Sequence, residues 1–306
     1  MRELKVTLET VTPLFLGGAE SKGMPEVRPP AFRGALRYWL RAMLGGVIGD
    51  QNLDGLHELE AAVWGSTDYG SPVHLRLSGN LKCGDYKILP HKEGSKAWLR
   101  KAFNAGQSIT LTLFQHLAQN DTVWQIACAT LALSLTFGGV GLRSRRGYGT
   151  LRVVDSTLDV VNPMPKTSEK WRDYIKKVVQ NVLVAGNQLA HQYAIPLQAL
   201  TDGPSRYPCA TRAGLIRLSE FYAVTSQEAV RHFMQNVPQV SALGGIKPHR
   251  QASPLWVRPV LTENGYQLLL VVLASQLESG TNYQTVRQFL DTRFPGTDIP
   301  VEGWNV

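Results

Sequence analysis

The chain has 306 residues, of which 43% are hydrophobic, so it has ample material for a core and a length typical of two domains. Its formal net charge of +8 favours a polyanionic partner or an anionic membrane surface. The apolar runs are too short to span a bilayer and the N-terminus lacks the apolar region of a secretory signal, so we expect a cytoplasmic protein. Three scattered cysteines (Cys83, Cys128 and Cys209) have no metal-ligand spacing, and we expect neither a metal nor a cofactor.

Apolar and polar residues alternate over residues 3 to 11, which predicts a half-buried strand that ends before Gly17-Gly18. A helix is predicted over residues 28 to 46, where Pro29-Pro30 suits the first turn and Gly45-Gly46 suits the stop. Its apolar residues recur at helical spacing and form one face: Phe32, Ala35, Leu36, Trp39, Leu40, Met43 and Leu44.

Arg33, Arg37 and Arg41 lie four residues apart and therefore form one ridge beside that apolar face. Like charges at this spacing cost roughly 0.2–0.5 kcal/mol per pair, and no acidic residue between 28 and 49 offsets them. A solvated face is the alternative, although such a face usually mixes both signs. Gly34 beside the ridge would let a phosphodiester chain approach the backbone, unless it packs against a neighbouring loop. We predict that these residues and Arg28 bind RNA phosphates.

A short helix is predicted over residues 55 to 64, followed by strands over 71 to 80 and 107 to 116. Between the two strands, residues 81 to 106 are polar, charged and irregular, which is unusual in a compact domain. Aromatic residues among cations could stack bases there. An insertion that is disordered or packed on a partner is an equal alternative.

Residues 121 to 137 predict a mostly apolar helix capped by Asp121. The segment that follows, GGVGLRSRRGYGTLR at 138 to 152, combines five glycines and four arginines with no acidic residue, and we call it the Gly/Arg loop. Glycine allows close approach to the backbone, and arginine offers a fork of donors suited to phosphate. The predicted RNA-binding residues of the loop are Gly138, Gly139, Gly141, Arg143, Ser144, Arg145, Arg146, Gly147, Tyr148 and Gly149.

The Gly/Arg loop is neither a Walker A motif, since it lacks the GK[ST] ending, nor a dinucleotide fingerprint, since it follows a helix and precedes a strand. The C-terminal end of a helix carries partial negative charge, so the arginines themselves would have to hold the phosphate. A simple turn with solvated arginines is the alternative. A strand is predicted over about 150 to 160, which completes the order strand, helix, strand, strand, helix, strand of the ferredoxin-like fold.

NPMPK at 162 to 166 suggests a domain break, so we predict an N-terminal domain over 1–162 and a C-terminal domain over 163–306. The second half contains a predicted long helix over 168 to 192, a strand, a helix, a hairpin turning at 263 to 265 and a final helix. It could be a degenerate copy of the first fold. LGGIKPHR at 243 to 250 is weakly similar to the Gly/Arg loop, so secondary RNA contacts are predicted at Lys247, His249 and Arg250. Gly17 and Gly18 are predicted as further secondary RNA contacts.

Proton transfer at a scissile phosphate would require a His, Tyr or Lys nearby. Tyr148 in the Gly/Arg loop and His249 with Lys247 are the candidates. We interpret each as a stacking or contact residue and predict no catalytic residue.

Four motifs in the first 160 residues, in this order, are TPLFLGGAE, RPPAFRGALRYWLRA, VWGST and GGVGLRSRRGYG. Together they resemble the RAMP superfamily of CRISPR proteins, and most closely the first-numbered RAMP subunit of the type III-B (Cmr) effector complex. The resemblance implies an α+β chain of two ferredoxin-like domains, each an antiparallel sheet with helices on one face. It leaves the C-terminal half with little to match.

The resemblance also implies a non-catalytic subunit that binds guide RNA near its 3′ end, together with target single-stranded RNA and other RAMP subunits, in antiviral defence. The phosphate contacts carried over from the family's motifs are Arg33, Arg37, Arg143, Arg145 and Arg146. The 81–106 insertion would be a thumb-like element or a subunit contact. The alternatives are a metal-independent endoribonuclease that matures guide RNA, and a basic module that binds proteins.

Overall fold

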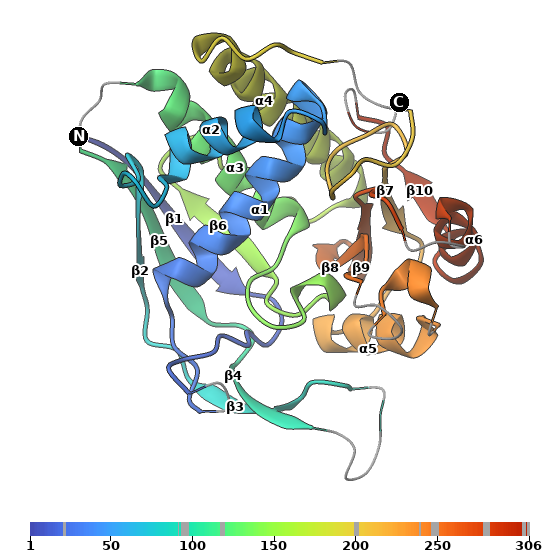
Figure 1. Ribbon diagram of the computed structural model, residues 1–306. Helices are drawn as coiled ribbons and strands as arrows, with labels where there is room; N and C mark the ends of the chain where they lie inside the picture. Colours follow the sequence, from blue (N-terminus) through green and yellow to red (C-terminus); the bar gives the residue numbers. More distant parts are fainter. Residues whose placement is uncertain are drawn as a thin grey trace.

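The computed structural model describes all residues except 21–22, 91, 93–97, 117–119, 199–201, 239, 246–250, 278–281, 302–303 and 305–306. The described residues build two four-stranded antiparallel sheets and a separate two-stranded hairpin (Figure 1). None of the described helices is long and apolar enough to cross a membrane.

The N-terminal sheet has the strand order β2-β5-β1-β6, and all neighbouring strands are antiparallel. Its strands are β1 (Arg2–Thr10), β2 (His74–Ser78), β5 (Ser108–Gln115) and β6 (Leu151–Ser156). Alternate residues of β1 and β5 are buried, as the period of two predicts, and Val6 pairs with Leu111 in the sheet centre. The two sheet neighbours of the first strand are therefore the third and fourth strands, which is the ferredoxin-like order.

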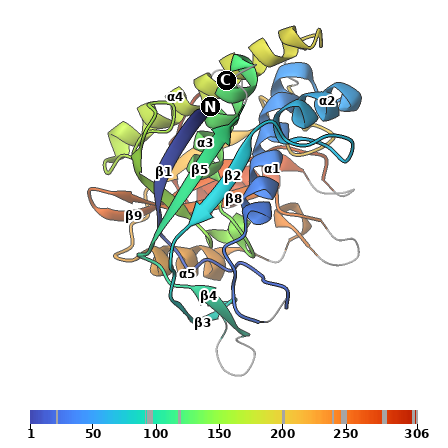
Figure 2. The same cartoon turned by 90° about the vertical axis from the view of Figure 1, so that its left-hand side faces the viewer.

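The helices α1 (Pro29–Ile48), α2 (Leu53–Trp64) and α3 (Asp121–Phe137) lie on one side of this sheet, and Figure 2 shows the strands in front of them. The predicted stop of α1 at Gly45-Gly46 is wrong, because the helix continues to Ile48. A side chain at Gly45 would collide with Cys209 and Tyr207, and the Ala210 amide donates to the Ala42 carbonyl at 2.8 Å. The glycine is thus used for close packing of the chain across α1.

The predicted cap of α3 is also wrong by one residue. Asn120 is the N-cap, and its side chain accepts a hydrogen bond from the Val123 amide at 3.1 Å. Asp121 lies in the first helical turn and forms an ion pair with Arg2 of β1. An acidic residue is favourable in this position because of the helix dipole.

The C-terminal sheet has the order β10-β7-β9-β8, which is the same fourth-first-third-second arrangement as in the N-terminal sheet. Its elements are β7 (Leu215–Ser219), α5 (Ser226–Asn236), β8 (Leu255–Thr262), β9 (Gly265–Val272), α6 (Tyr283–Arg293) and β10 (Gly296–Asp298). The hairpin turns before Gly265, which adopts a φ of 113°. The structure thus confirms the fold class of two ferredoxin-like units.

The long helix α4 (Ser168–Gln192) connects the two units and packs along α3 and α1. Its apolar residues, including Trp171 and Val182, belong to the same buried cluster as those of α3. The sequence position of α4 lies beyond 162, yet its packing is with the N-terminal sheet's helices. The division of the chain at residue 162 stays a prediction.

The 81–106 insertion contains a β-hairpin of β3 (Cys83–Lys87) and β4 (Leu99–Phe103), rather than the irregular segment predicted. The hairpin is fastened to the chain after β1, because Leu14 and Phe103 exchange two backbone hydrogen bonds of 3.0 Å. The side chain of Trp98, just before β4, is 68% exposed. Part of the connection between the two strands lies outside the described residues.

Candidate nucleic-acid interface

The Gly/Arg loop leaves the end of α3 and returns to β6, and an arginine from the other half of the chain holds both of its ends. Arg258 of β8 donates to the Gly138 carbonyl at 3.3 Å and to the Leu151 carbonyl. Its side chain is buried, and burial lowers the pKa of its guanidinium to about 9. The light-green loop accordingly lies between α1 and β8 in Figure 1.

The glycines fold the loop tightly against residues 13–16. Gly141 has a φ of 87° and Gly149 a φ of 65°, both in the left-handed region. The Leu142 amide donates to the Phe15 carbonyl at 2.9 Å, and the Gly149 amide donates to the Pro13 carbonyl at 3.1 Å. Only Gly141 among the predicted glycines of the loop is exposed; the buried ones are Gly138, Gly139, Gly147 and Gly149. Much of the glycine content therefore serves the loop's own fold.

Arg143 opens the 3₁₀ turn Ser144–Arg146, and it is a non-glycine residue with a φ of 64°. Its side chain is half-buried, and it has no hydrogen bond or ion pair among the described residues. Burial lowers the pKa of its guanidinium. Ser144 is half-exposed beside it. This is the loop's unpaired cation.

Arg145 points toward α1 and the C-terminal sheet. Its guanidinium lies 5.4 Å from the ring centre of Tyr38 and 5.1 Å from that of Trp256. Its Nη1 donates to the Ser253 carbonyl at 2.8 Å. Cation–π contacts and this hydrogen bond therefore tie the loop to both halves of the chain.

Arg146 is directed into the C-terminal half. Its Nη2 donates to the Leu243 carbonyl at 2.7 Å, its guanidinium lies 5.7 Å from the Phe233 ring centre, and its Nη1 is buried without a partner. Burial and the charges of Arg143 and Arg145 lower its pKa to about 10. Among the described residues, no carboxylate forms an ion pair with any of these three arginines.

Tyr148 is buried at the base of the loop. Its hydroxyl donates to the Lys87 carbonyl of β3 at 3.0 Å, and its ring meets Phe15 edge-on at 5.0 Å. Burial raises the pKa of the hydroxyl to about 12. The side chain is thus engaged in joining the hairpin to the loop.

The expectation that no acidic residue offsets the arginines of α1 is wrong, because Glu60 reaches them from α2. Glu60 is buried and accepts from Arg37 at 2.8 Å and from Arg41 at 2.9 Å. Arg37 also donates to the carbonyls of Trp64 at 2.8 Å and Gly65 at 2.6 Å. These two arginines fasten α2 to α1.

At the start of α1, unlike at Arg37 and Arg41, the arginines have no carboxylate partner among the described residues. Arg28 is exposed, and the half-exposed Arg33 has no hydrogen bond or ion pair within the described part of the chain. Gly34 is exposed, and a Cβ added there would meet nothing within 4 Å. The packing of a neighbouring loop therefore does not explain this glycine.

Gly17 is likewise exposed, with open space where a side chain would be, whereas a Cβ on Gly18 would collide with the Glu26 carboxylate. A shallow cleft brings Gly17 together with Leu142 of the Gly/Arg loop and Arg100 and Lys101 of the hairpin. The predicted contacts Lys247, His249 and Arg250 lie outside the described residues.

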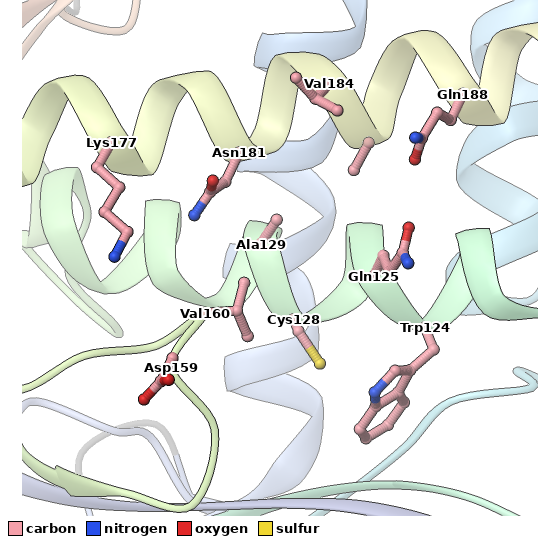
Figure 3. Close-up of a pocket in the computed structure, with 11 residues that line it drawn as sticks. Trp124, Gln125, Cys128, Ala129, Asp159, Val160, Lys177, Asn181, Val184 and Gln188 are labelled. Carbon is pink, nitrogen blue, oxygen red and sulfur yellow. The ribbon is translucent and has the colours of Figure 1, made fainter.

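Sequence reasoning missed Arg258 and Glu60, whereas the cations of β4 belong to the charged 81–106 segment in which base stacking is one alternative. A signal existed for Arg258, since an arginine in the otherwise apolar run LWVRPVL requires buried partners. A cavity of about 430 Å³ also lies elsewhere, between α3 and α4. Its lining includes Lys177 and Asn181, and Figure 3 shows Gln188 of α4 facing Gln125 of α3. No group of three or more metal-ligating side chains occurs in the described part of the chain.

Comparison with known proteins gives one consistent result. Residues 7–152 match the model of the RAMP superfamily. The Cmr1-1 subunit of the Pyrococcus furiosus CRISPR system Cmr is 26% identical over 274 residues, which cover 81% of this chain and 80% of that protein. The apo crystal structure of Cmr1 from P. furiosus superposes with a TM-score of 0.71 at 20% identity, covering 99% of this chain and 100% of that one. A chain of the type III-B Cmr-beta complex bound to cognate target RNA and AMPPnP gives a TM-score of 0.64 at 12% identity, covering 94% and 98%.

Proposed function

Because this chain carries a RAMP-superfamily domain and resembles Cmr1 over most of its length, we propose that it is a guide-RNA-binding subunit of a type III-B CRISPR effector complex. It would bind near the 3′ end of the guide, in the cytoplasm, without a cofactor. Its partners would be guide RNA, target single-stranded RNA and other RAMP subunits. Cleavage would belong to other subunits.

One observation carries the RNA-binding proposal. Arg143, Arg145 and Arg146 crowd onto one 3₁₀ turn without a carboxylate among the described residues, and burial, together with the charges of the other two arginines, lowers the pKa of Arg146. Such a concentration of positive charge is stabilised by a bound polyanion. RNA phosphate satisfies both the charge and the geometry of guanidinium donors.

The same surface offers a path for the RNA backbone. Arg145 contacts Tyr38, which places the Gly/Arg loop beside the helix that carries Arg33 and Gly34. We assign direct phosphate contacts to Arg143, Arg33 and Arg28, which have no ion pair among the described residues, with the open backbone of Gly34 next to Arg33. The remaining predicted residues would shape this surface: Arg37 and Arg41 through α2, and Arg145 and Arg146 through the C-terminal half.

The experiment is equilibrium binding of fluorescent single-stranded RNA to the full chain at several salt concentrations. The affinity should fall with log K decreasing by about 0.7 per released phosphate contact for each tenfold rise in salt. The mutant Arg143→Ala should reduce both the affinity and this slope, while Lys177→Ala, in the α3–α4 cavity, should change neither. A salt-independent affinity would contradict the proposal.

The alternative function, an endoribonuclease that matures guide RNA, is tested with the same protein and the same RNA. The RNA is incubated with excess protein in EDTA and then run on a denaturing gel. Intact RNA is expected, since the hydroxyl of Tyr148 is already bonded to the Lys87 carbonyl. A discrete cut that survives EDTA would replace the proposed function with guide-RNA maturation.

A further inference from the structure

A second cavity, of about 290 Å³, lies at the end of the N-terminal sheet opposite the Gly/Arg loop. The register of the sheet shows the separation: Arg2 pairs with Gln115 at the cavity end, whereas Thr10 pairs with Leu151 at the loop end. The lining residues are Ala62, Pro72, His74, Gln115, His116, Asn120, Val123 and Tyr193. They come from α2, the strands β2 and β5, and the ends of α3 and α4.

A cluster of flat rings lies beside this cavity. His74 of β2 stacks on its cross-strand neighbour Phe114 of β5, with ring centres 5.2 Å apart and planes at 20°. His116 meets both rings edge-on, at 5.5 Å from His74 and 5.3 Å from Phe114. Tyr193, at the end of α4, contributes a further ring to the lining. Phe114 does not line the cavity and lies on the face of β5 opposite Gln115, so the rings available for stacking a planar heterocycle there are those of His74, His116 and Tyr193.

Gln115 is a polar residue at a buried position of this cavity where an apolar one is expected. It occupies an inward-facing position of β5, where the alternation of Ile109, Leu111 and Leu113 calls for another apolar side chain. Its side chain is only 2% exposed, and its Oε1 has no hydrogen-bond partner among the residues that the structure describes. A buried polar group without a hydrogen-bond partner destabilises the fold, because it has lost its bonds to water without gaining others. A ligand in the cavity would remove that destabilisation.

We propose that this cavity binds an unpaired adenine base. A glutamine carboxamide carries one acceptor and one donor group, and it pairs with adenine through N6 and N7. The terminal torsion of glutamine is soft, so the carboxamide can turn toward the base at little cost. Among the described residues, neither carboxylates nor Lys or Arg side chains line the cavity, which favours a neutral planar ring over an anion or a metal ion.

The base could come from single-stranded RNA or from a free adenosine nucleotide, and only the first source rests on the proposed function. The two are separated by two probes for the full chain: oligo(A) and oligo(U) of equal length, and adenosine alone. Oligo(A) should bind about tenfold more tightly than oligo(U), which is the discrimination that one bidentate hydrogen-bonded pair between a side chain and a base provides. Adenosine should bind more weakly, yet measurably by NMR line broadening or calorimetry.

The decisive variant is Gln115→Leu. It removes the unpaired carboxamide and restores the apolar alternation of β5, so the variant should fold with an unchanged or higher Tm. It should abolish both the preference for oligo(A) and the binding of adenosine. His74→Ala, which removes a stacking ring, should weaken both. The control Gln188→Leu, on the exposed face of α4, should leave both unchanged.

Adenosine binding that depends on Gln115, without any preference between the oligonucleotides, would support the cavity with a free nucleotide as its ligand. Equal binding of oligo(A) and oligo(U) together with no binding of adenosine would overturn the inference. Weak, sequence-independent RNA binding would then still be compatible with the Gly/Arg loop, so the two proposals fail separately.

Discussion

Two groups of arginines that look alike in the sequence have opposite surroundings in the structure. Arg37 and Arg41 on α1 share the buried carboxylate of Glu60, and Arg37 also donates to the backbone carbonyl of Trp64 at the end of α2. The arginines of the Gly/Arg loop have aromatic rings and carbonyls as partners but no carboxylate within the described chain. One carboxylate thus offsets part of the charge of the first group, whereas the charge of the second group has no such internal partner among the described residues and is available to an external anion.

This difference teaches that spacing and density of arginine do not separate a structural cation from a binding cation. The two kinds of arginine differ in whether the tertiary fold places a carboxylate within ion-pair distance of the guanidinium. Single substitutions in the two groups, and in the residues that hold them, test this distinction.

Arg258→Met should have the largest effect. It leaves the carbonyls of Gly138 and Leu151 without their donor, and two hydrogen bonds from a charged group are worth roughly 3 kcal/mol of unfolding free energy. Urea denaturation should show this loss, and hydrogen exchange should show faster opening of the Gly/Arg loop. RNA affinity should fall although Arg258 itself is buried.

The matched control is Arg217→Met in β7. Arg217 is also buried, but it is paired with Asp291 and Asp298, within the C-terminal unit. Its loss should lower stability without accelerating exchange in the Gly/Arg loop or changing the RNA affinity of the folded protein. Equal RNA defects in the two variants would show that Arg258 acts through general stability alone.

Arg37→Ala should lower the unfolding free energy by about 2 kcal/mol, since it removes a partner of Glu60 and the donor to two carbonyls. Its effect on RNA affinity should be smaller than that of Arg143→Ala. Thermal melts and RNA titrations of both variants provide the comparison. A larger RNA defect in Arg37→Ala would contradict its assignment as a structural cation and make Arg37 a phosphate contact.

Arg143→Ala should reduce RNA affinity about tenfold while changing the unfolding free energy by less than about 0.5 kcal/mol, because its side chain has no hydrogen-bond or ion-pair partner among the described residues. The same titrations and melts measure both quantities. A loss of stability without a loss of affinity would make Arg143 a structural residue like Arg37.

Gly34→Ala should have the smallest effect, and with opposite signs in two assays. Alanine stabilises a helix interior by about 1 kcal/mol relative to glycine, and nothing in the fold obstructs the added methyl group. The melting temperature should therefore rise while RNA affinity falls severalfold. Unchanged affinity would remove Gly34 from the interface.

Local patterns sufficed for much of the fold. The alternation in β1 and β5, the helical periodicity of α1 and the order of elements correctly predicted the ferredoxin-like unit. The β3–β4 hairpin was not predicted, because its strands are short and polar and carry no apolar alternation. The true end of α1 depended on a distant segment at 207–210, which no local pattern reveals.

The candidate site was harder to predict from the sequence than the fold, because it too depends on contacts between distant segments. Glu60 lies 19 and 23 residues beyond Arg41 and Arg37 and reaches them only because α2 folds back along α1. Arg258 lies more than 100 residues beyond the loop that it holds. Residue types indicated where charge is concentrated, and only tertiary contacts indicate which charges remain unpaired.

The salt dependence of single-stranded RNA binding, measured for the unsubstituted chain and for Arg143→Ala, tests the central claim most directly. If the unpaired guanidinium of Arg143 contacts a phosphate, the slope of log K against log salt should become less steep by about 0.7 in the variant. An identical slope in the two proteins would contradict the claim that the Gly/Arg loop holds the RNA backbone.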